Sequence, residues 1–179
     1  MSIPILTSII IFIIAPVVAI FAVYFWGDWR HWKRYYPTIL FYIAMNLLAM
    51  VLMSDHLLWI WEDTPITPPR KISEFLFIYI FYPADILIFL AHYPRKWVAR
   101  IVWILLFVVI MSILEISGIM GGYVFYDYGW GFWWSVGMNL VIHLVLLLHF
   151  KRPLWAWLIS IPLIAFFLMQ FGFSIGDLN

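Results

Sequence analysis

The chain has 179 residues, of which 66% are hydrophobic and 11% charged, with a formal net charge of +1 and a mean hydropathy of +1.03. A soluble domain is about 45–50% apolar and about 25% charged. This composition excludes a soluble globule, a disordered chain and a basic nucleic-acid-binding protein, and the absence of cysteine excludes a disulfide scaffold. It predicts a polytopic membrane protein with a single transmembrane domain over residues 1–179.

Six apolar stretches are long enough to cross a bilayer, because a helix needs about 20 mostly apolar residues to span about 30 Å of hydrocarbon. Short polar segments separate them, and only the connection at residues 55–74 has room for further structure. We therefore expect an all-α membrane protein, a bundle of six transmembrane helices with short loops. In chain order, the expected spans are residues 3–26, 35–54, 75–94, 101–122, 130–150 and 154–175.

The first stretch carries no charged residue, no basic leading region and no small-residue cleavage site, so we expect a retained span rather than a removed signal peptide. After the second span, Leu57–Trp61 could continue the second helix or lie on the surface, and nothing in the sequence supports the third alternative, a re-entrant helix. Residues 64–69 of the same connection contain three prolines and should be extended, because each proline fixes its own φ and restricts the residue before it.

The basic residues set the expected orientation. Eight of the ten lie in the connections after the first, third and fifth spans, whereas Arg70 and Lys71 follow the second. The positive-inside rule places the eight in the cytoplasm and both termini outside. The eight are Arg30, Lys33, Arg34, Arg95, Lys96, Arg100, Lys151 and Arg152.

Aromatic residues gather at the borders of the expected spans, as they do in the aromatic belts of membrane proteins. One group precedes and opens the fifth span: Tyr126, Tyr128, Trp130, Trp133 and Trp134. A stacked aromatic pocket for a planar ligand is the alternative interpretation, and nothing in the spacing favours it.

Four expected spans carry polar side chains near the membrane centre, where a charged residue costs about 2.5–3.5 kcal/mol on insertion scales. Asp85 follows Pro83, whose ring frees a backbone carbonyl one turn earlier. Asn139 and His143 are spaced i, i+4 and therefore share a helix face. The candidate intramembrane polar cluster consists of Asn46, Asp85, Glu115, Asn139 and His143.

Two interpretations of these residues stay open. If the helices bring them together, they could form a proton or cation relay or the floor of a ligand pocket. Alternatively, protonated carboxyl groups could bond to the asparagines and to the freed carbonyl as interhelical contacts, each contributing about 0.6 kcal/mol.

No motif of a hydrolase, metalloprotease or phosphate-binding enzyme is present, so we predict no catalytic residue, cofactor or metal site. The expected environment is a lipid bilayer, with no nucleic-acid partner. The sequence favours an accessory or scaffold protein whose partner is another membrane protein or a second copy of the chain. The alternative is binding or transport of a small solute, a proton or a cation, and a lipid-modifying intramembrane enzyme is a more distant one.

Several sequence segments resemble those of a known family of membrane proteins. They are Tyr128–Ser135 (YGWGFWWS), His149–Ala156 (HFKRPLWA), Trp32–Thr38 (WKRYYPT), Asp55–Trp59 (DHLLW), Tyr82-Pro83 and Glu115. From about residue 29 to residue 160, the chain resembles a family of uncharacterised small multi-pass membrane proteins of endospore-forming Gram-positive bacteria. The resemblance implies the bacterial cytoplasmic membrane and no particular activity. Aspartate is usual in that family where this chain has Asn46, so the chain lacks one intramembrane acid there.

Overall fold

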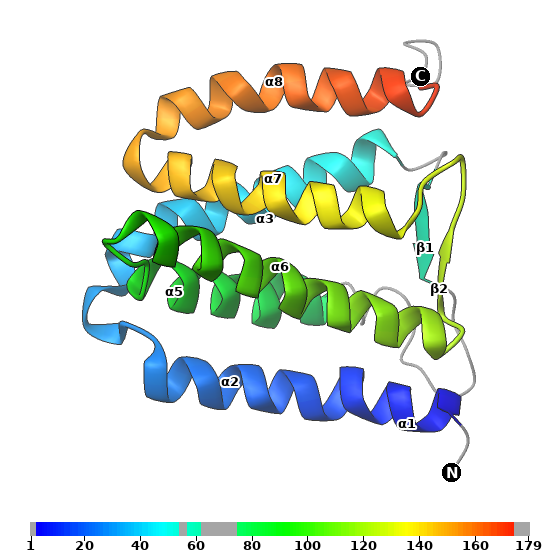
Figure 1. Cartoon of the computed structure of the whole chain (residues 1–179), viewed down its shortest axis with the longest axis horizontal. Helices are drawn as coiled ribbons and strands as arrows, with labels where there is room; N and C mark the ends of the chain where they lie inside the picture. Colours follow the sequence, from blue (N-terminus) through cyan, green and yellow to red (C-terminus); the bar gives the residue numbers. More distant parts are fainter. Residues whose placement is uncertain (1–2, 54–56, 62–74, 174–179) are drawn as a thin grey trace.

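The computed structural model describes residues 3–53, 57–61 and 75–173. Helices dominate this part of the chain and run side by side as a bundle (Figure 1). Among the described residues, five helices are long and apolar enough to cross a membrane: Ile5–Trp26, Trp29–Leu52, Trp97–Met120, Phe132–Lys151 and Pro153–Gln170. The third expected span, residues 75–94, contains a shorter apolar helix, Phe77–Ala91. The helical, apolar architecture is thus confirmed, and the count of six spans stays a prediction.

Two continuous helical rods, the first at residues 3–26 and the third at residues 77–91, each contain a π-helical segment that ends two residues before a proline. In the first rod, α1 (Ile3–Ile9) continues through a π segment (Ile10–Ile14) into α2 (Ala15–Trp26), which has Pro16 in its first turn. In the third, a π segment (Phe77–Phe81) precedes α5 (Tyr82–Ala91) and its Pro83. Because proline lacks an N–H and its ring crowds the carbonyl one turn earlier, the wider π turn accommodates it without ending the helix.

The remaining helices are α3 (Trp32–Leu52), α6 (Trp97–Met120), α7 (Phe132–Lys151) and α8 (Pro153–Gln170). Helix α6 begins at Trp97, before the start of the expected fourth span at residue 101. Helix α8 ends at Gln170, and Gly172 after it adopts a φ of +75°, whereas the expected sixth span runs to residue 175, outside the described residues. Glycine takes up this left-handed conformation easily, and it commonly terminates a helix.

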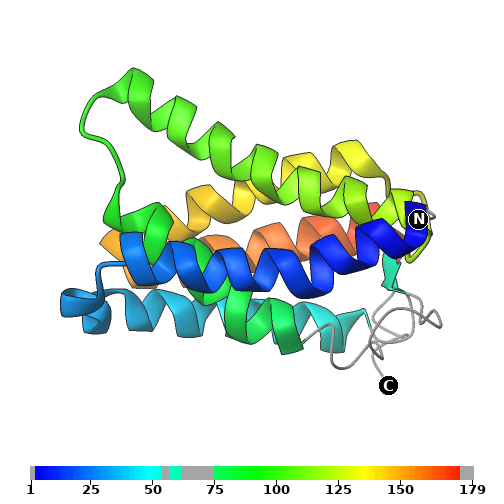
Figure 2. The ribbon, with the colours of Figure 1, turned by 90° about the horizontal axis from the view of Figure 1, so that it is seen from below.

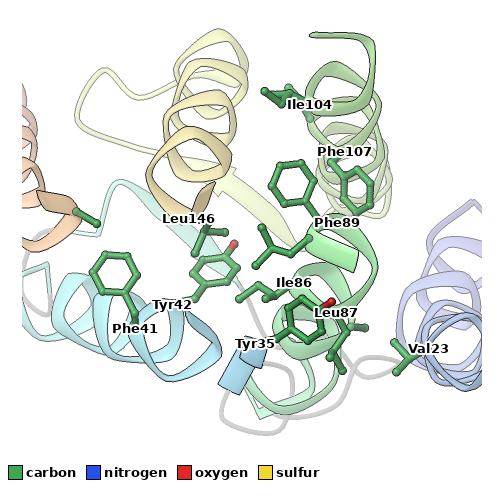
Figure 3. Packing of buried hydrophobic residues seen from close by; sticks show 14 residues of the cluster. Val23, Tyr35, Phe41, Tyr42, Ile86, Leu87, Phe89, Ile104, Phe107 and Leu146 are labelled. Carbon is green, nitrogen blue, oxygen red and sulfur yellow. The ribbon is translucent and has the colours of Figure 1, made fainter. Parts of the chain in front are cut away.

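Neighbouring helices pack in a consistent order: α2 on α5, α5 on α3, α3 on α7, and α7 on both α6 and α8. Figure 2 shows the same bundle from below, with α1 and α2 in front. The largest cluster of buried apolar side chains lies where α3, α5, α6 and α7 meet (Figure 3). At its centre, the rings of Phe89 and Phe107 are 5.1 Å apart, and Ile86 and Phe89 have no exposed surface. Close van der Waals packing of this kind stabilises helices in a membrane.

A short antiparallel ribbon joins two connections of the bundle. Strand β1 (Trp59–Trp61) pairs with β2 (Val124–Tyr126), and Ile60 faces Phe125. The expectation that Leu57–Trp61 continues the helix is therefore wrong, and its position at the surface stays a prediction. Aromatic and β-branched residues favour strands, and pairing satisfies backbone groups that would otherwise be buried without partners.

Gly118 allows the ribbon to approach α6. A Cβ atom at this position would lie 2.5 Å from Cγ2 of Val124, so a larger residue would push β2 away. The ribbon thereby covers the end of the bundle at which α3 and α6 finish and α7 begins (Figure 1).

Successive helices begin at alternate ends of the bundle, as the expected orientation requires. α1 starts, and α3, α6 and α8 finish, at the ribbon end, whereas the connections at residues 27–31, 92–96 and 152 lie at the opposite end (Figures 1 and 2). The eight basic residues named above lie in or beside these latter connections. The side of the membrane that each end faces stays a prediction. Residues 64–69, expected to be extended, lie outside the described residues, as do Arg70 and Lys71.

Candidate functional site

A cavity of about 380 Å³, partly open to the outside, lies between the helices in the half of the bundle that carries the ribbon. Its wall is formed by α3, the π segment and first turn of the third rod, α6, α7, α8 and the ribbon. It extends from Trp59 and Trp130 at the ribbon end to Phe41 and Ser160, which lie near the middle of their helices. The cavity thus lies between helices, most of which are long and apolar enough to cross a membrane.

Methionine is the most conspicuous component of this wall. Five of the eight methionines of the chain line the cavity: Met45, Met50, Met53, Met111 and Met138. Methionine is unbranched and flexible, and surfaces rich in it adapt to ligands of different shape. The cavity wall is therefore apolar and adaptable.

Glu115 is the centre of a hydrogen-bonded group at the cavity wall. Its Oε1 accepts hydrogen bonds from the Tyr126 hydroxyl at 2.8 Å and from the Ser135 hydroxyl at 2.5 Å. Ser135 Oγ in turn accepts a hydrogen bond from Trp130 Nε1 at 2.8 Å. Both bonds end on the same carboxyl oxygen, so Oε2 has no partner among the described residues. Glu115, Ser135 and Trp130 all line the cavity.

The two asparagines of the candidate cluster also line the cavity. Asn46 Nδ2 donates a hydrogen bond to the Tyr82 hydroxyl at 2.9 Å, and the Tyr82 ring stacks on Tyr42 with centroids 4.2 Å apart. Asn139 lies one turn beyond Ser135 on α7 and accepts a hydrogen bond from the His143 ring on its backbone carbonyl. The asparagine side chains are therefore the second source of polarity in a mostly apolar wall.

Asp85 and His143 form a separate, deeply buried pair. His143 Nε2 is 3.4 Å from Asp85 Oδ1, and the two side chains have 0% and 2% exposed surface, respectively. His143 Nδ1 lies 2.7 Å from the carbonyl of Asn139 and must carry a hydrogen, because a carbonyl only accepts. The contact between Nε2 and Oδ1 is therefore a hydrogen bond only when one proton lies between these two atoms. Asp85 Oδ2 has no partner among the described residues.

The five candidate residues thus divide into two groups. Asn46, Glu115 and Asn139 border the cavity, whereas Asp85 and His143 lie outside its lining. The structure does not bring all five together.

Sequence reasoning missed the partners of these residues. Trp130, interpreted as part of an aromatic belt, is only 6% exposed and packs on Trp59 and Phe171, with centroids 5.2 and 4.9 Å apart. Trp133, by contrast, is 79% exposed and fits the belt interpretation. The alternation of buried and exposed aromatic residues at a helix start has no signal in composition alone.

A second buried contact was also missed. Thr38 Oγ1 lies 3.0 Å from His149 Nδ1, and the imidazole stacks on Phe41 with centroids 4.2 Å apart. The residues stand on α3 and α7, far apart in the sequence, so no local pattern indicates that they meet.

Outside the long helices, the protonation of one cavity partner follows from its surroundings. Burial, and then the hydrogen bond to Glu115, raise the pKa of the Tyr126 hydroxyl well above its usual value. Tyr126 therefore remains a donor to Glu115 at neutral pH.

No protein-family model, curated protein or solved structure matched the chain. Within residues 3–53, 57–61 and 75–173, no group of three His, Asp, Glu or Cys side chains is placed to hold a metal ion. The cavity and its polar groups are therefore the candidate functional site.

Proposed function

We propose that this protein is a multi-pass protein of the bacterial cytoplasmic membrane that binds a small amphipathic molecule inside its helical bundle. The cavity carries the proposal: about 380 Å³, with an apolar wall and the polar side chains of Asn46, Glu115 and Asn139. Ligand pockets of about 300–1,000 Å³, mostly apolar with a few placed polar groups, are typical of small-molecule sites.

The apolar wall supports an amphipathic ligand more strongly than a hydrated ion. A bare ion that enters the cavity loses its whole hydration shell, and the polar side chains of the wall, among them Asn46, Glu115 and Asn139, replace only part of it. A hydrocarbon body, in contrast, fills an apolar cavity that is unfavourable for water. Such a molecule also concentrates in the surrounding bilayer, from which it can reach the cavity.

The membrane arrangement belongs to the same proposal. Six spans, with the basic end in the cytoplasm and both termini outside, put the cavity in the outer half of the bundle. The family resemblance supports the bacterial cytoplasmic membrane. The accessory role and the lipid-modifying alternative stay predictions, and the cavity bears on neither of them.

Two alanines of α3 provide a matched test. Ala49 lines the cavity, whereas Ala44 is exposed on the outside of the same helix. Ala49→Phe should fill the cavity, and Ala44→Phe adds the same side chain to the lipid-facing surface. The measurement is the midpoint of thermal unfolding in lipid nanodiscs with increasing n-octanol.

A bound ligand stabilises the folded state by about 2.7 kcal/mol at a concentration one hundred times its Kd. We expect a saturable rise of the midpoint for the wild type and for Ala44→Phe, and none for Ala49→Phe. An equal response of all three proteins would mean that octanol acts through the bilayer and would overturn the proposal.

A further inference from the structure

We infer that the cavity selects a ligand with a cationic head group, such as a primary ammonium, and that Glu115 binds this head. The inference rests on the proposed function and specifies its ligand class. Among the described residues that line the cavity, Glu115 is the only Asp, Glu, Lys, Arg or His. The wall therefore carries one acid and no basic side chain.

The hydrogen bonds of Glu115 leave one side of the carboxyl group open. The hydroxyls of Tyr126 and Ser135 both donate to Oε1, and no described residue bonds to Oε2. The Ser135 bond, at 2.5 Å, has the short length typical of a hydroxyl donating to a carboxylate. A carboxylate has about four acceptor positions, so an ammonium can donate to Oε2 while the two hydroxyls keep their bonds to Oε1.

A further acceptor lies on the same helix face. Asn139 is four residues after Ser135 on α7, and residues with this spacing are neighbours on a helix surface. Its side-chain carbonyl is therefore a second oxygen for an ammonium, which has three N–H donors. The hydrogen-bonding capacity of the wall on this side thus suits a donor-rich head group.

The charge of the head group decides between ligands with the same hydrocarbon body. A carboxylate head would place a second negative charge near Glu115, where the low dielectric strengthens repulsion and no cation of the wall offsets it. An alcohol can donate one hydrogen bond but leaves the Glu115 charge uncompensated. An ammonium donates hydrogen bonds and also compensates the charge of Glu115. The affinity should therefore fall in the order ammonium, alcohol, carboxylate.

Three probes with one body test this order: n-octylammonium, n-octanol and n-octanoate. Their dissociation constants are measured at neutral pH in nanodiscs of zwitterionic phosphatidylcholine, so that the bilayer itself does not attract the cation. The proteins compared are the wild type, Glu115→Gln, Ala49→Phe and Asp127→Asn. Asp127 is an exposed acid near the ribbon, outside the cavity lining, and serves as the charge-matched control.

For the wild type, we expect n-octylammonium to bind at least about tenfold more tightly than n-octanol, which corresponds to about 1.4 kcal/mol. Glu115→Gln should lose this preference and Asp127→Asn should keep it. If Glu115→Gln does not fold, the order of the three probes on the wild type decides by itself.

Two outcomes would contradict the inference or the proposed function on which it rests. Equal affinity of the ammonium and the alcohol, both lost in Ala49→Phe, would overturn the cationic head group and leave cavity binding intact. Equal binding of every probe to the wild type and to Ala49→Phe would overturn the proposed function itself.

Discussion

Replacing one member of the buried Asp85–His143 pair should destabilise the protein more than replacing both. The pair connects α5 and α7 inside the largest apolar cluster, where His143 packs against Phe89 and Phe107 with centroids 5.0 and 5.8 Å apart. Asp85→Leu leaves His143 Nε2 without a partner, and His143→Phe leaves the Asp85 carboxyl group without one. The double replacement removes both polar groups and keeps the volume filled.

The magnitude follows from the geometry. The distance of 3.4 Å between Nε2 and Oδ1 is longer than the usual 2.7–3.2 Å of an N–H···O bond, so the direct attraction is weak, near the average of about 0.6 kcal/mol for interhelical bonds in membranes. Leaving a buried polar group unpaired costs more, about 1–3 kcal/mol. Each single replacement should therefore lower the free energy of unfolding by about 1–3 kcal/mol. The double replacement should stay within about 1 kcal/mol of the wild type, because well-packed apolar side chains commonly substitute for a buried polar pair.

The assay is equilibrium unfolding in mixed micelles with increasing dodecyl sulfate, followed by far-ultraviolet circular dichroism, for the four proteins of a double-mutant cycle. Residues in direct contact are expected to deviate from additivity. A double replacement that loses as much as the sum of the two single replacements would refute this reasoning, because each residue would then stabilise the bundle independently of the other.

Three further predictions concern other contacts. Gly118→Ala should lower the free energy of unfolding by about 1–3 kcal/mol, because the added methyl group overpacks against Val124. Gly137→Ala, with open space around it, should be neutral or stabilising by up to about 1 kcal/mol. Chemical unfolding measures both changes. Thr38→Val should cost about 1–3 kcal/mol because His149 loses its partner, while Ser117→Ala, whose hydroxyl bonds only within its own helix, should cost less than about 0.5 kcal/mol in the same assay. Burial raises the pKa of Tyr123 to about 12, so the folded state keeps this proton when the unfolded chain, with a pKa of about 10, releases it. Its stability contribution is complete below pH about 10 and is lost as the pH rises towards about 12, so Tyr123→Phe should reduce the alkaline loss of stability.

Much of the architecture could be predicted because membrane helices leave a strong signal in hydropathy. The long apolar stretches, the proline that opens α8 and the polar residues that interrupt the spans are all visible in the sequence. The ribbon is not, because three-residue strands have no periodicity and Trp59–Trp61 pairs with a segment more than sixty residues away. The π segments could not be predicted either. Pro83 indicates a disturbed helix backbone, but the sequence does not determine whether the helix breaks, bends or widens there.

The candidate site could be predicted in part. Asn46, Glu115 and Asn139 attract attention because polar groups in a membrane are costly, and these three border the cavity. Their partners Tyr126 and Trp130 could not be predicted, because aromatic residues at the border of a span are typical of an aromatic belt. Only the ribbon and the start of α7 direct these two side chains inward. The cavity methionines come from α3 and its C-cap Met53, from α6 and from α7, so that their common cavity exists only in the folded bundle.

The most direct test of cavity binding is a crystal structure of the protein soaked with 8-bromooctylammonium, in which anomalous scattering locates the bromine atom. We predict a single bromine peak inside the cavity, on the side of Met138 and Phe167, with the ammonium within hydrogen-bonding distance of Glu115 Oε2. Bromine found only on the lipid-facing surface of the helices, with the cavity free of ligand, would contradict the account.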